Sequence, residues 1–339
     1  MREAGAALLE ELTRAAAIGP ADALRHFGLL RRAARRLDEE LARRRPDLAV
    51  LVDFGDYNLP VIAPILKRHG VRIAYFTSPQ VWAWGRWRLR SIRRHVERML
   101  VFFAFEEAFY REAGVPVTWV GHPLVGECRP SMAPEAARNH YGLAQVRATV
   151  GLLPGSRRAE LGRHLPLMLR AAERLAWDLP GAQFLVPLAA GLDPEPVRRA
   201  ASRARADIVV ASGGMADALS VMDAAIVASG TATLETALAG VPMAVVYRMP
   251  WLTYLPARAL VRTKHIAMVN VIAGREVVPE FIQHRATPRR LARAVAGLLA
   301  DAQARERMRA ELRAVTDQLG APGAIERAAD CILELLQRT

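Results

Sequence analysis

The strongest constraint on this chain is a series of short apolar runs, each closed by turn-forming residues and followed by a stretch of helical pattern. The run at 48–52 ends in DFGDYN, and the run at 149–153 ends in PGSR. Apolar runs of five or six residues between such breakers are typical of strands buried in a parallel sheet. Strands that alternate with helices predict a doubly wound α/β fold.

The pattern occurs twice along the chain, on either side of a proline-containing linker at 121–134. Strands are expected at 48–52, 71–76, 98–103 and 117–120, and then at 149–153, 183–187, 208–211, 224–228 and 241–247. Helices are expected at 31–45, 59–69, 106–113, 161–176, 215–221 and 231–239, and residues 287–336 are almost wholly helical in character. Two similar α/β halves are therefore the predicted architecture.

Composition excludes several classes of protein. The only cysteines, Cys128 and Cys331, lie far apart, which rules out a disulfide scaffold and argues against a cysteine-rich metal site. There are 47 Lys and Arg against 34 Asp and Glu, which gives a formal charge of +13. This excess favours an anionic partner such as nucleic acid, anionic lipid or a phosphorylated substrate, with arginine-rich genome composition as the alternative.

No signal peptide is readable at the start, and no apolar run approaches the roughly 18 residues needed to span a bilayer. The expected location is cytoplasmic, with a peripheral membrane contact left open. One candidate for that contact is an apolar and basic stretch, and its alternative is a helix stripe that faces the core. The stretch comprises the apolar residues Leu24, Phe27, Leu29 and Leu30 and the basic residues Arg25, His26 and Arg31.

The loop after the expected strand 149–153 is a candidate phosphate site, because ligands of open α/β sheets bind outside the carboxyl ends of strands. Gly155 and Ser156 let the backbone approach a ligand, and Arg157 can fork onto phosphate oxygens. A plain strand–turn–helix with exposed arginines is the alternative.

The loop SGTATLE after the strand 224–228 has the same placement. Its hydroxyls and amides could hold a diphosphate, and Glu235 could accept a hydrogen bond from a ribose hydroxyl. The residues concerned are Ser229, Gly230, Thr231, Ala232, Thr233 and Glu235. Simple helix capping by Ser229 or Thr231 is the alternative. Neither loop matches the Walker pattern, so ATP hydrolysis has no support.

Acidic and amide side chains make up a third candidate group. Asp53 and Asp56 follow the first expected strand, where a carboxylate could act as a general base on a sugar hydroxyl. Together with Asn58 they could equally be ordinary turn residues. For Asn270 the alternative is an ordinary polar loop residue.

The segment SPQVWAWGRWR at 78–88 interleaves tryptophans with arginines and contains Ser78 and Trp82. Such a segment could stack nucleobases or lie at a membrane interface, or it could be a surface helix with part-buried tryptophans. The eight histidines show no metal-ligand spacing.

Taken together, these segments resemble the lipid-A-disaccharide synthase family, which comprises inverting glycosyltransferases of the two-domain GT-B fold. The matching segments are VDFGDYN at 52–58, SPQVWAW at 78–84, FFAFEEAFYREAGVPVTWVGHPLV at 102–125, LLPGSRRAEL at 152–161, ASGTATLETALAGVPMAVVYR at 228–248 and NVIAGREVVPE at 270–280. The combination is highly specific, although each segment alone is not.

The resemblance implies transfer of diacylglucosamine from UDP to the 6-hydroxyl of diacylglucosamine 1-phosphate. It makes Asp53 the general base, places Arg157 and Asn270 at the diphosphate, and assigns the rest of the UDP to the SGTATLE loop. The other residues expected at the substrates are Asp56, Asn58, Ser78, Trp82, Gly155 and Ser156. No metal or other cofactor is implied, because basic groups and amides can stabilise the departing diphosphate.

The resemblance also sets the expected domains. These are an acceptor-side Rossmann-like domain at 1–125, a UDP-sugar domain at 126–310 facing it across a cleft, and C-terminal helices at 311–339 that pack back across both. Members of the family open with a strand and a GEASGD-like loop that this chain lacks, so the first domain is expected to be incomplete, with an exposed sheet edge. A truncated version is our interpretation, with a fragment or a degenerate copy as alternatives.

Because both implied substrates are acylated, the expected location becomes the cytoplasmic face of the inner membrane. A homodimer is left open, and nucleic acid is not an expected partner because no nucleic-acid motif is present. The alternatives are an inactive or truncated remnant that still binds UDP, and a related GT-B enzyme that uses another UDP-sugar.

Overall fold

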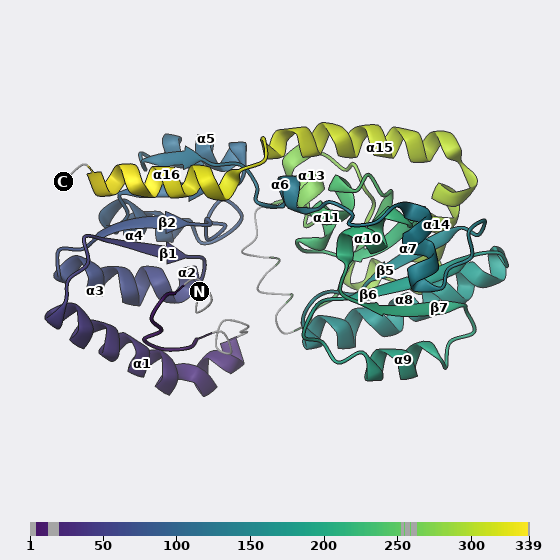
Figure 1. Cartoon of the computed structure of the whole chain (residues 1–339), viewed down its shortest axis with the longest axis horizontal. Helices are drawn as coiled ribbons and strands as arrows, with labels where there is room; N and C mark the ends of the chain where they lie inside the picture. The colour runs from purple at the N-terminus through teal and green to yellow at the C-terminus, as the bar shows by residue number, and fades with distance from the viewer. Residues whose placement is uncertain (1–4, 13–19, 252–253, 255–257, 259–262, 338–339) are drawn as a thin grey trace. The chain divides into compact units, whose positions relative to one another are not determined.

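The computed structural model describes residues 5–12, 20–251, 254, 258 and 263–337 (Figure 1). The chain forms two compact units. Unit 1 comprises Met1–Gly121 and Gly323–Thr339, and unit 2 comprises His122–Pro322. The expected division placed the boundary at 125 and treated 311–339 as one segment. In the structure, α15 (Ala302–Thr316) belongs to unit 2, whereas α16 (Ala324–Gln337) belongs to unit 1.

Unit 1 is built on a parallel sheet of four strands in the order β1-β2-β3-β4. The strands are β1 (Leu48–Val52), β2 (Arg72–Phe76), β3 (Arg98–Val101) and β4 (Val117–Trp119). The helices between and before them are α1 (Pro20–Arg43), α2 (Gly55–Tyr57), α3 (Ala63–Arg68), α4 (Leu89–His95) and α5 (Ala104–Glu112). Fully buried side chains such as Ile73, Tyr75 and Met99 form the core between sheet and helices.

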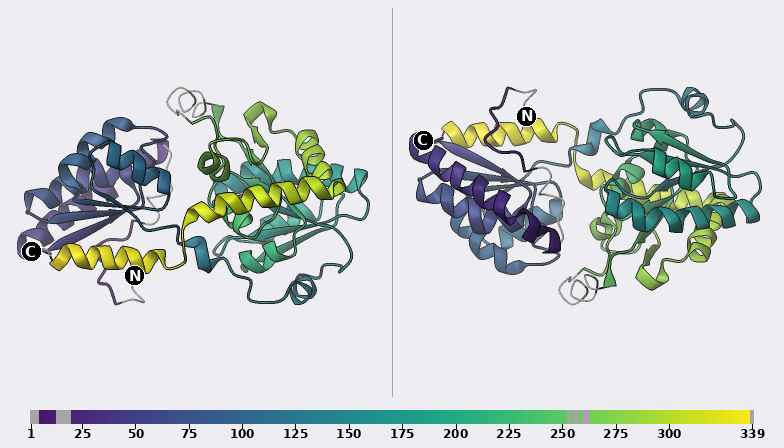
Figure 2. Two further views of the ribbon diagram at one scale, coloured as in Figure 1. Left: turned by 90° about the horizontal axis from the view of Figure 1, so that it is seen from above. Right: turned by 90° about the horizontal axis from the view of Figure 1, so that it is seen from below.

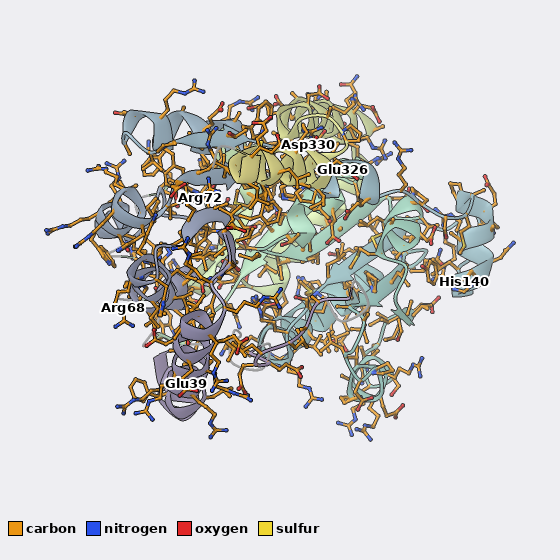
Figure 3. All side chains as sticks on the ribbon, turned by 60° about the vertical axis from the view of Figure 1, so that its left-hand side comes forward. Glu39, Arg68, Arg72, His140, Glu326 and Asp330 are labelled. Carbon is orange, nitrogen blue, oxygen red and sulfur yellow. The ribbon has the colours of Figure 1, made fainter. Side chains whose placement is uncertain are left out.

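The last helix of the chain returns to this unit. Arg72 on β2 donates to the carbonyl of Leu335 at 2.7 Å, and Arg327 donates to the carbonyl of Val120 at 2.9 Å. Ala324, Ala328 and Leu335 form the buried stripe of α16, at helical spacing. The opposite, exposed side carries Glu326 and Asp330 (Figure 3).

Unit 2 has a six-stranded parallel sheet in the order β10-β9-β8-β5-β6-β7. Its strands are β5 (Thr149–Leu153), β6 (Gln183–Leu188), β7 (Ile208–Ser212), β8 (Ala224–Ala228), β9 (Met243–Tyr247) and β10 (Glu280–Ile282). Its helices are α6 (Leu124–Glu127), α7 (Pro134–Tyr141), α8 (Arg158–Asp178), α9 (Glu195–Ala201), α10 (Met215–Ser220), α11 (Ala232–Leu238), α13 (Met268–Ala273), α14 (Pro288–Ala300) and α15. Figure 2 shows the helices lying on both faces of this sheet.

The chain reverses its direction of progress across this sheet at one place. From β5 it runs outward to β6 and β7, and it then returns to the other side of β5 for β8, β9 and β10. This is the doubly wound arrangement in which ligands bind at the carboxyl ends of the strands beside the reversal. The prediction of an α/β fold with two parallel-sheet halves is confirmed.

One local prediction needs correction. The helix expected at 59–69 is a π-helical turn over Asn58–Ile62 followed by α3, and the amide of Ala63 bonds to the carbonyl of Asn58. Pro60 and Pro64 lack the N–H groups that a regular α-helix needs there. Asn270, for which an ordinary polar loop residue was the alternative, lies in α13, and β10 follows this helix.

The surface of unit 1 carries exposed apolar side chains. β1 is an edge strand of its sheet, and Val50 and Val52 on it are 40% and 50% exposed. Phe27 on α1 is 64% exposed, whereas Leu30 packs against the core. The side chains of Leu24, Arg25 and His26, which belong to the predicted lipid contact, lie outside the described residues. Within the described ranges no helix combines the length and the apolar character that crossing a membrane requires.

Candidate active site

The turn after β1 carries Asp53 on an unusual backbone. Asp53 and the next residue, Phe54, have φ angles of 44° and 46°, which few non-glycine residues adopt. The carbonyl of Asp53 accepts hydrogen bonds from Asn58 Nδ2 at 2.8 Å and from the Tyr75 hydroxyl at 2.5 Å. The carboxylate is exposed, and no described residue pairs with it. The turn therefore holds the backbone in place and leaves the carboxylate open to a substrate.

Asp56 lies on the same turn but is already paired. Its carboxylate accepts from the guanidinium of Arg88, which is only 9% exposed and lies 3.9 Å above the centre of the Trp84 ring. Asp56 thus orients the buried Arg88. A substrate that contacts Asp56 would have to bind a carboxylate that is already paired with Arg88. Sequence reasoning missed Arg88, although its place among tryptophans was a usable signal.

Ser78 and Trp82 follow β2, whereas Asp53 follows β1. Because β1 and β2 are parallel neighbours, the residues after the two strands lie at the same edge of the sheet. The Ser78 hydroxyl lies 3.0 Å from the Tyr110 hydroxyl, and Trp82 Nε1 donates to Glu106 at 3.0 Å. Burial raises the pKa of the Glu106 carboxyl to about 7. Ser78 and Trp82 are therefore fixed by a buried polar cluster whose other members, Glu106 and Tyr110, were not predicted.

In unit 2, the predicted phosphate loop lies directly after β5. Gly155 has a φ of 113°, and a Cβ built on it would lie 2.5 Å from Glu160 Oε2. The Glu160 carboxylate accepts from the amides of Ser156 at 3.2 Å and Arg157 at 3.4 Å, and its other oxygen lies 3.1 Å from Arg157 Nη1. The donors expected to bind a phosphate thus already surround an internal anion, which the sequence reading did not include.

His164, on the second turn of α8, holds the start of this loop. Arg248 donates its amide to Nε2 at 3.1 Å, so Nδ1 carries the proton and donates to the carbonyl of Pro154 at 3.0 Å. The ring is fully buried, and burial lowers the pKa of this imidazole. The neutral form of His164 therefore joins the phosphate loop to the end of β9.

The second predicted loop follows β8, the direct neighbour of β5. Ser229 donates to the carbonyl of Ile266 at 2.9 Å, and Thr233 donates to the carbonyl of Gly230 at 2.7 Å. Thr231 occupies the N-cap position of α11 but makes no side-chain capping bond. Among the described residues, none accepts from the amides at 230–232. These amides are thus open, and burial raises the pKa of the nearby Glu235 carboxyl.

Asn270 is fully buried in α13 and uses its whole hydrogen-bonding capacity inside the protein. Its amide nitrogen donates to the Val278 carbonyl and to Glu280, both at 2.8 Å, and its oxygen accepts from the amides of Val277 at 2.7 Å and Val278 at 3.0 Å. Glu280 in turn accepts from the amides at 266 and 267. Asn270 and Glu280 therefore hold the segment to which Ser229 bonds, and Asn270 has no spare donor for a diphosphate.

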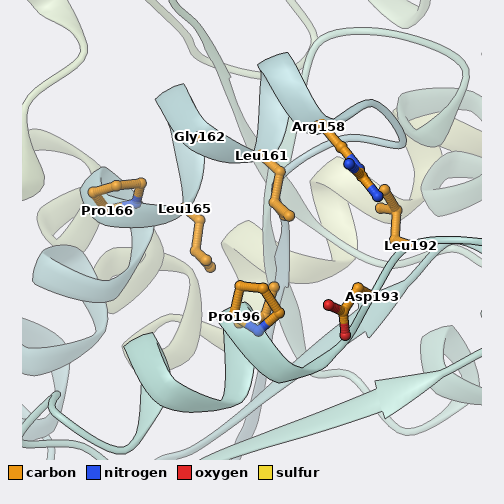
Figure 4. A pocket seen from close by; sticks show the side chains of 9 residues that line it. Arg158, Leu161, Gly162, Leu165, Pro166, Leu192, Asp193 and Pro196 are labelled. Carbon is orange, nitrogen blue, oxygen red and sulfur yellow. The ribbon is translucent and has the colours of Figure 1, made fainter.

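A shallow pocket of about 360 Å³ lies between α8 and α9 (Figure 4). Its apolar lining includes Leu161, Leu165 and Leu192, with Arg158 and Asp193 among its polar residues. Of the predicted site residues, none is in its lining, so the two loops and not this pocket define the candidate site of unit 2.

The chain matches the family model described as "LpxB: Lipid-A-disaccharide synthetase" over residues 1–333. It is 41% identical over 336 residues to the lipid-A-disaccharide synthase of Geobacter sulfurreducens, covering 99% of this chain and 87% of the relative. The synthase of Anaeromyxobacter dehalogenans strain 2CP-C is 42% identical over 338 residues, covering 99% of this chain and 88% of the relative.

Two solved structures share the fold at low sequence identity. The calicheamicin glycosyltransferase CalG4 has a TM-score of 0.61 and 17% identity, over 100% of this chain and 88% of its own. The UDP-GlcNAc 2-epimerase of Neisseria meningitidis bound to UDP-GlcNAc has a TM-score of 0.56 and 13% identity, over 92% of this chain and 81% of its own. The family match extends over nearly the whole chain, and its fold is that of these GT-B proteins, so the chain belongs to the lipid-A-disaccharide synthase family, the glycosyltransferases of lipid A biosynthesis.

Proposed function

We propose that the chain transfers diacylglucosamine from UDP to the 6-hydroxyl of diacylglucosamine 1-phosphate and forms a β-1,6 disaccharide 1-phosphate and UDP. The observation that carries this proposal is the pair of loops after β5 and β8. They flank the reversal point of the unit 2 sheet, where a nucleotide-binding α/β protein receives its ligand. The sugar named in this proposal is the one that the resemblance to the family implies.

Asp53 is the proposed general base. In the reaction, the proton of the acceptor hydroxyl passes to the Asp53 carboxylate and the hydroxyl oxygen attacks C1 of the donor sugar. The bond from C1 to the diphosphate breaks, and its electron pair leaves with UDP, so attack from the opposite face inverts the configuration at C1. An exposed carboxylate on a fixed turn suits this role, because the base must reach the hydroxyl in a defined geometry.

The loops of unit 2 are the proposed UDP site. The guanidinium of Arg157 and the open amides at 230–232 would stabilise the charge that develops on the leaving diphosphate. Glu235 would accept from a ribose hydroxyl. Asn270 becomes a positioning residue, because its side chain is fully engaged beneath the segment that holds Ser229.

Acylated substrates imply work at a membrane surface, and we place the protein on the cytoplasmic face of the inner membrane. The exposed Phe27 and the net positive charge support this part of the proposal. Co-sedimentation with vesicles of anionic phospholipid tests it, and Phe27→Asp is expected to reduce the bound fraction. If wild type and Phe27→Asp bound equally to neutral and to anionic vesicles, the proposed membrane contact would be contradicted.

The decisive experiment incubates the protein with both acylated substrates and measures disaccharide and UDP. Asp53→Asn is expected to lower kcat by about 10²- to 10⁴-fold, whereas its affinity for UDP stays within about twofold of wild type, since only the general base is lost. Full turnover by this variant would refute the assigned base. UDP binding by wild type without any disaccharide would instead favour the UDP-binding remnant, and turnover of a different UDP-sugar would favour a related transferase.

A further inference from the structure

We propose that Glu160 is an internal competitor of the donor: its carboxylate occupies an anion position of the phosphate loop, and the diphosphate of the donor displaces it. The inference rests on the proposed function, because it concerns the same loop. It adds a residue that competes with the substrate for the groups that bind it.

Three donors converge on this one carboxylate. The amides of Ser156 and Arg157 and the guanidinium of Arg157 all lie within 3.1–3.4 Å of its oxygens. These are the groups that a phosphate at this strand end would use. A phosphate and the carboxylate cannot share them without bringing two like charges into contact, so one must leave.

The internal contact is weak enough to be replaced. Its amide bonds, at 3.2 and 3.4 Å, are at the long end of the range for N–H···O bonds. The side chain of Arg157 is 65% exposed and that of Glu160 is 24% exposed, so water screens their ion pair. A diphosphate, with more charge and more acceptor oxygens, is the stronger ligand for the same donors.

Under this inference the two loops of the site differ in whether a ligand must displace an internal group. The amides at 230–232 have no described acceptor and need no displacement. A ligand without phosphate, such as uridine, would leave Glu160 in place. The carboxylate therefore lowers the affinity for ligands that carry a diphosphate and leaves the affinity for neutral nucleosides unchanged.

Calorimetric titration of the full chain with UDP and with uridine tests the inference. Glu160→Gln keeps the size and one acceptor oxygen but removes the competing charge. It is expected to bind UDP about threefold to tenfold more tightly than wild type and to bind uridine unchanged. Asp178→Asn is the matched control, because it removes one exposed charge from the far end of the same helix, and it is expected to change neither affinity by more than about twofold.

The outcomes separate the two proposals. Equal or weaker UDP binding by Glu160→Gln overturns the inference and leaves the proposed function standing, since wild type would still bind UDP. Absence of UDP binding in wild type overturns both. Circular dichroism checks that the variant is folded, and Glu160→Ala serves as the second variant, with the same direction of change expected for UDP.

Discussion

The phosphate loop after β5 and the SGTATLE loop after β8 look alike in sequence but differ in what surrounds them. Both follow a buried strand, both contain a glycine, and the two strands are neighbours in the sheet. In the first loop the amides of Ser156 and Arg157 bond to Glu160, whereas in the second no described residue accepts from the amides at 230–232. Similar loop sequences can thus present either a filled or an open set of donors.

The two loops also differ in the origin of their supports. Glu160 and His164, which hold the first loop, lie within ten residues of it along α8. The second loop depends on distant residues, because Ser229 bonds to Ile266, which Glu280 and Asn270 hold in place. One loop is supported locally and the other by tertiary structure, so changes at the supports should separate them.

The largest effect is expected from Asn270→Ala, which removes four buried hydrogen bonds beneath the second loop. The free energy of unfolding should fall by about 3–5 kcal/mol, because the amides of Val277 and Val278 lose their acceptor. Chemical denaturation measures this change. Asn139→Ala is the control on an exposed amide that bonds to Gln145. A loss for Asn270→Ala below about 1 kcal/mol would contradict the tertiary support.

A smaller effect is expected from alanine at the two glycines. Gly155→Ala should destabilise the protein by about 2–3 kcal/mol, since its Cβ would collide with Glu160 and its φ is 113°. Gly230→Ala, with a φ of 155° and nothing within 4 Å of the added Cβ, should cost about 1 kcal/mol from backbone strain alone. Denaturant midpoints compare the two variants directly. Equal losses would show that the loops are packed alike.

Arg157→Ala tests the function of the first loop with little change in its fold. The guanidinium is mostly exposed, so the midpoint of unfolding should stay nearly constant. We expect kcat/KM for the donor to fall about 10- to 50-fold, the effect of losing one charged hydrogen bond to the diphosphate. Arg158→Ala, at the next position and also exposed, should change it by less than about threefold. Equal effects of the two variants would remove the special role of Arg157.

The smallest effect concerns pH and His164. Because burial lowers the pKa of this imidazole, the unfolded chain binds its proton more readily, and stability is lost as the pH falls below the ordinary value of 6.5. The loss from this group should be under about 1 kcal/mol at pH 6. His164→Gln cannot be protonated, so its stability should vary less between pH 7 and pH 6. An unchanged slope would show that His164 does not titrate in this range.

Much of the fold followed from residue pattern alone. The strands at 48–52, 149–153 and 224–228 were predicted with the ends that the structure has, because apolar runs stop at residues that favour turns. The short strand β10 and the helix α13 were not predicted. Their segment has few breakers, and Asn270 is polar by type but buried by its partners.

The candidate site was predictable in outline only. Loop residues such as Gly155 and Ser229 could be chosen from their places after strands. The residues that hold the loops could not, because their roles depend on contacts that the sequence does not reveal. Glu160 had one usable signal, since it lies three residues after Arg157, at the position of a capping-box acid. No such sequence signal pointed to Glu280, because it contacts Asn270 across the turn that joins α13 to β10.

The edge strand β1 has a consequence for how this protein behaves in concentrated solution. Among the described strands β1 has a neighbour on one side only, and with Val50 and Val52 exposed this edge is a template on which another extended chain can add. Strand addition of this kind is a second-order process, so it grows with protein concentration and with time on storage. We therefore expect the strand that precedes the proposed base Asp53 to limit how long a concentrated sample remains monodisperse.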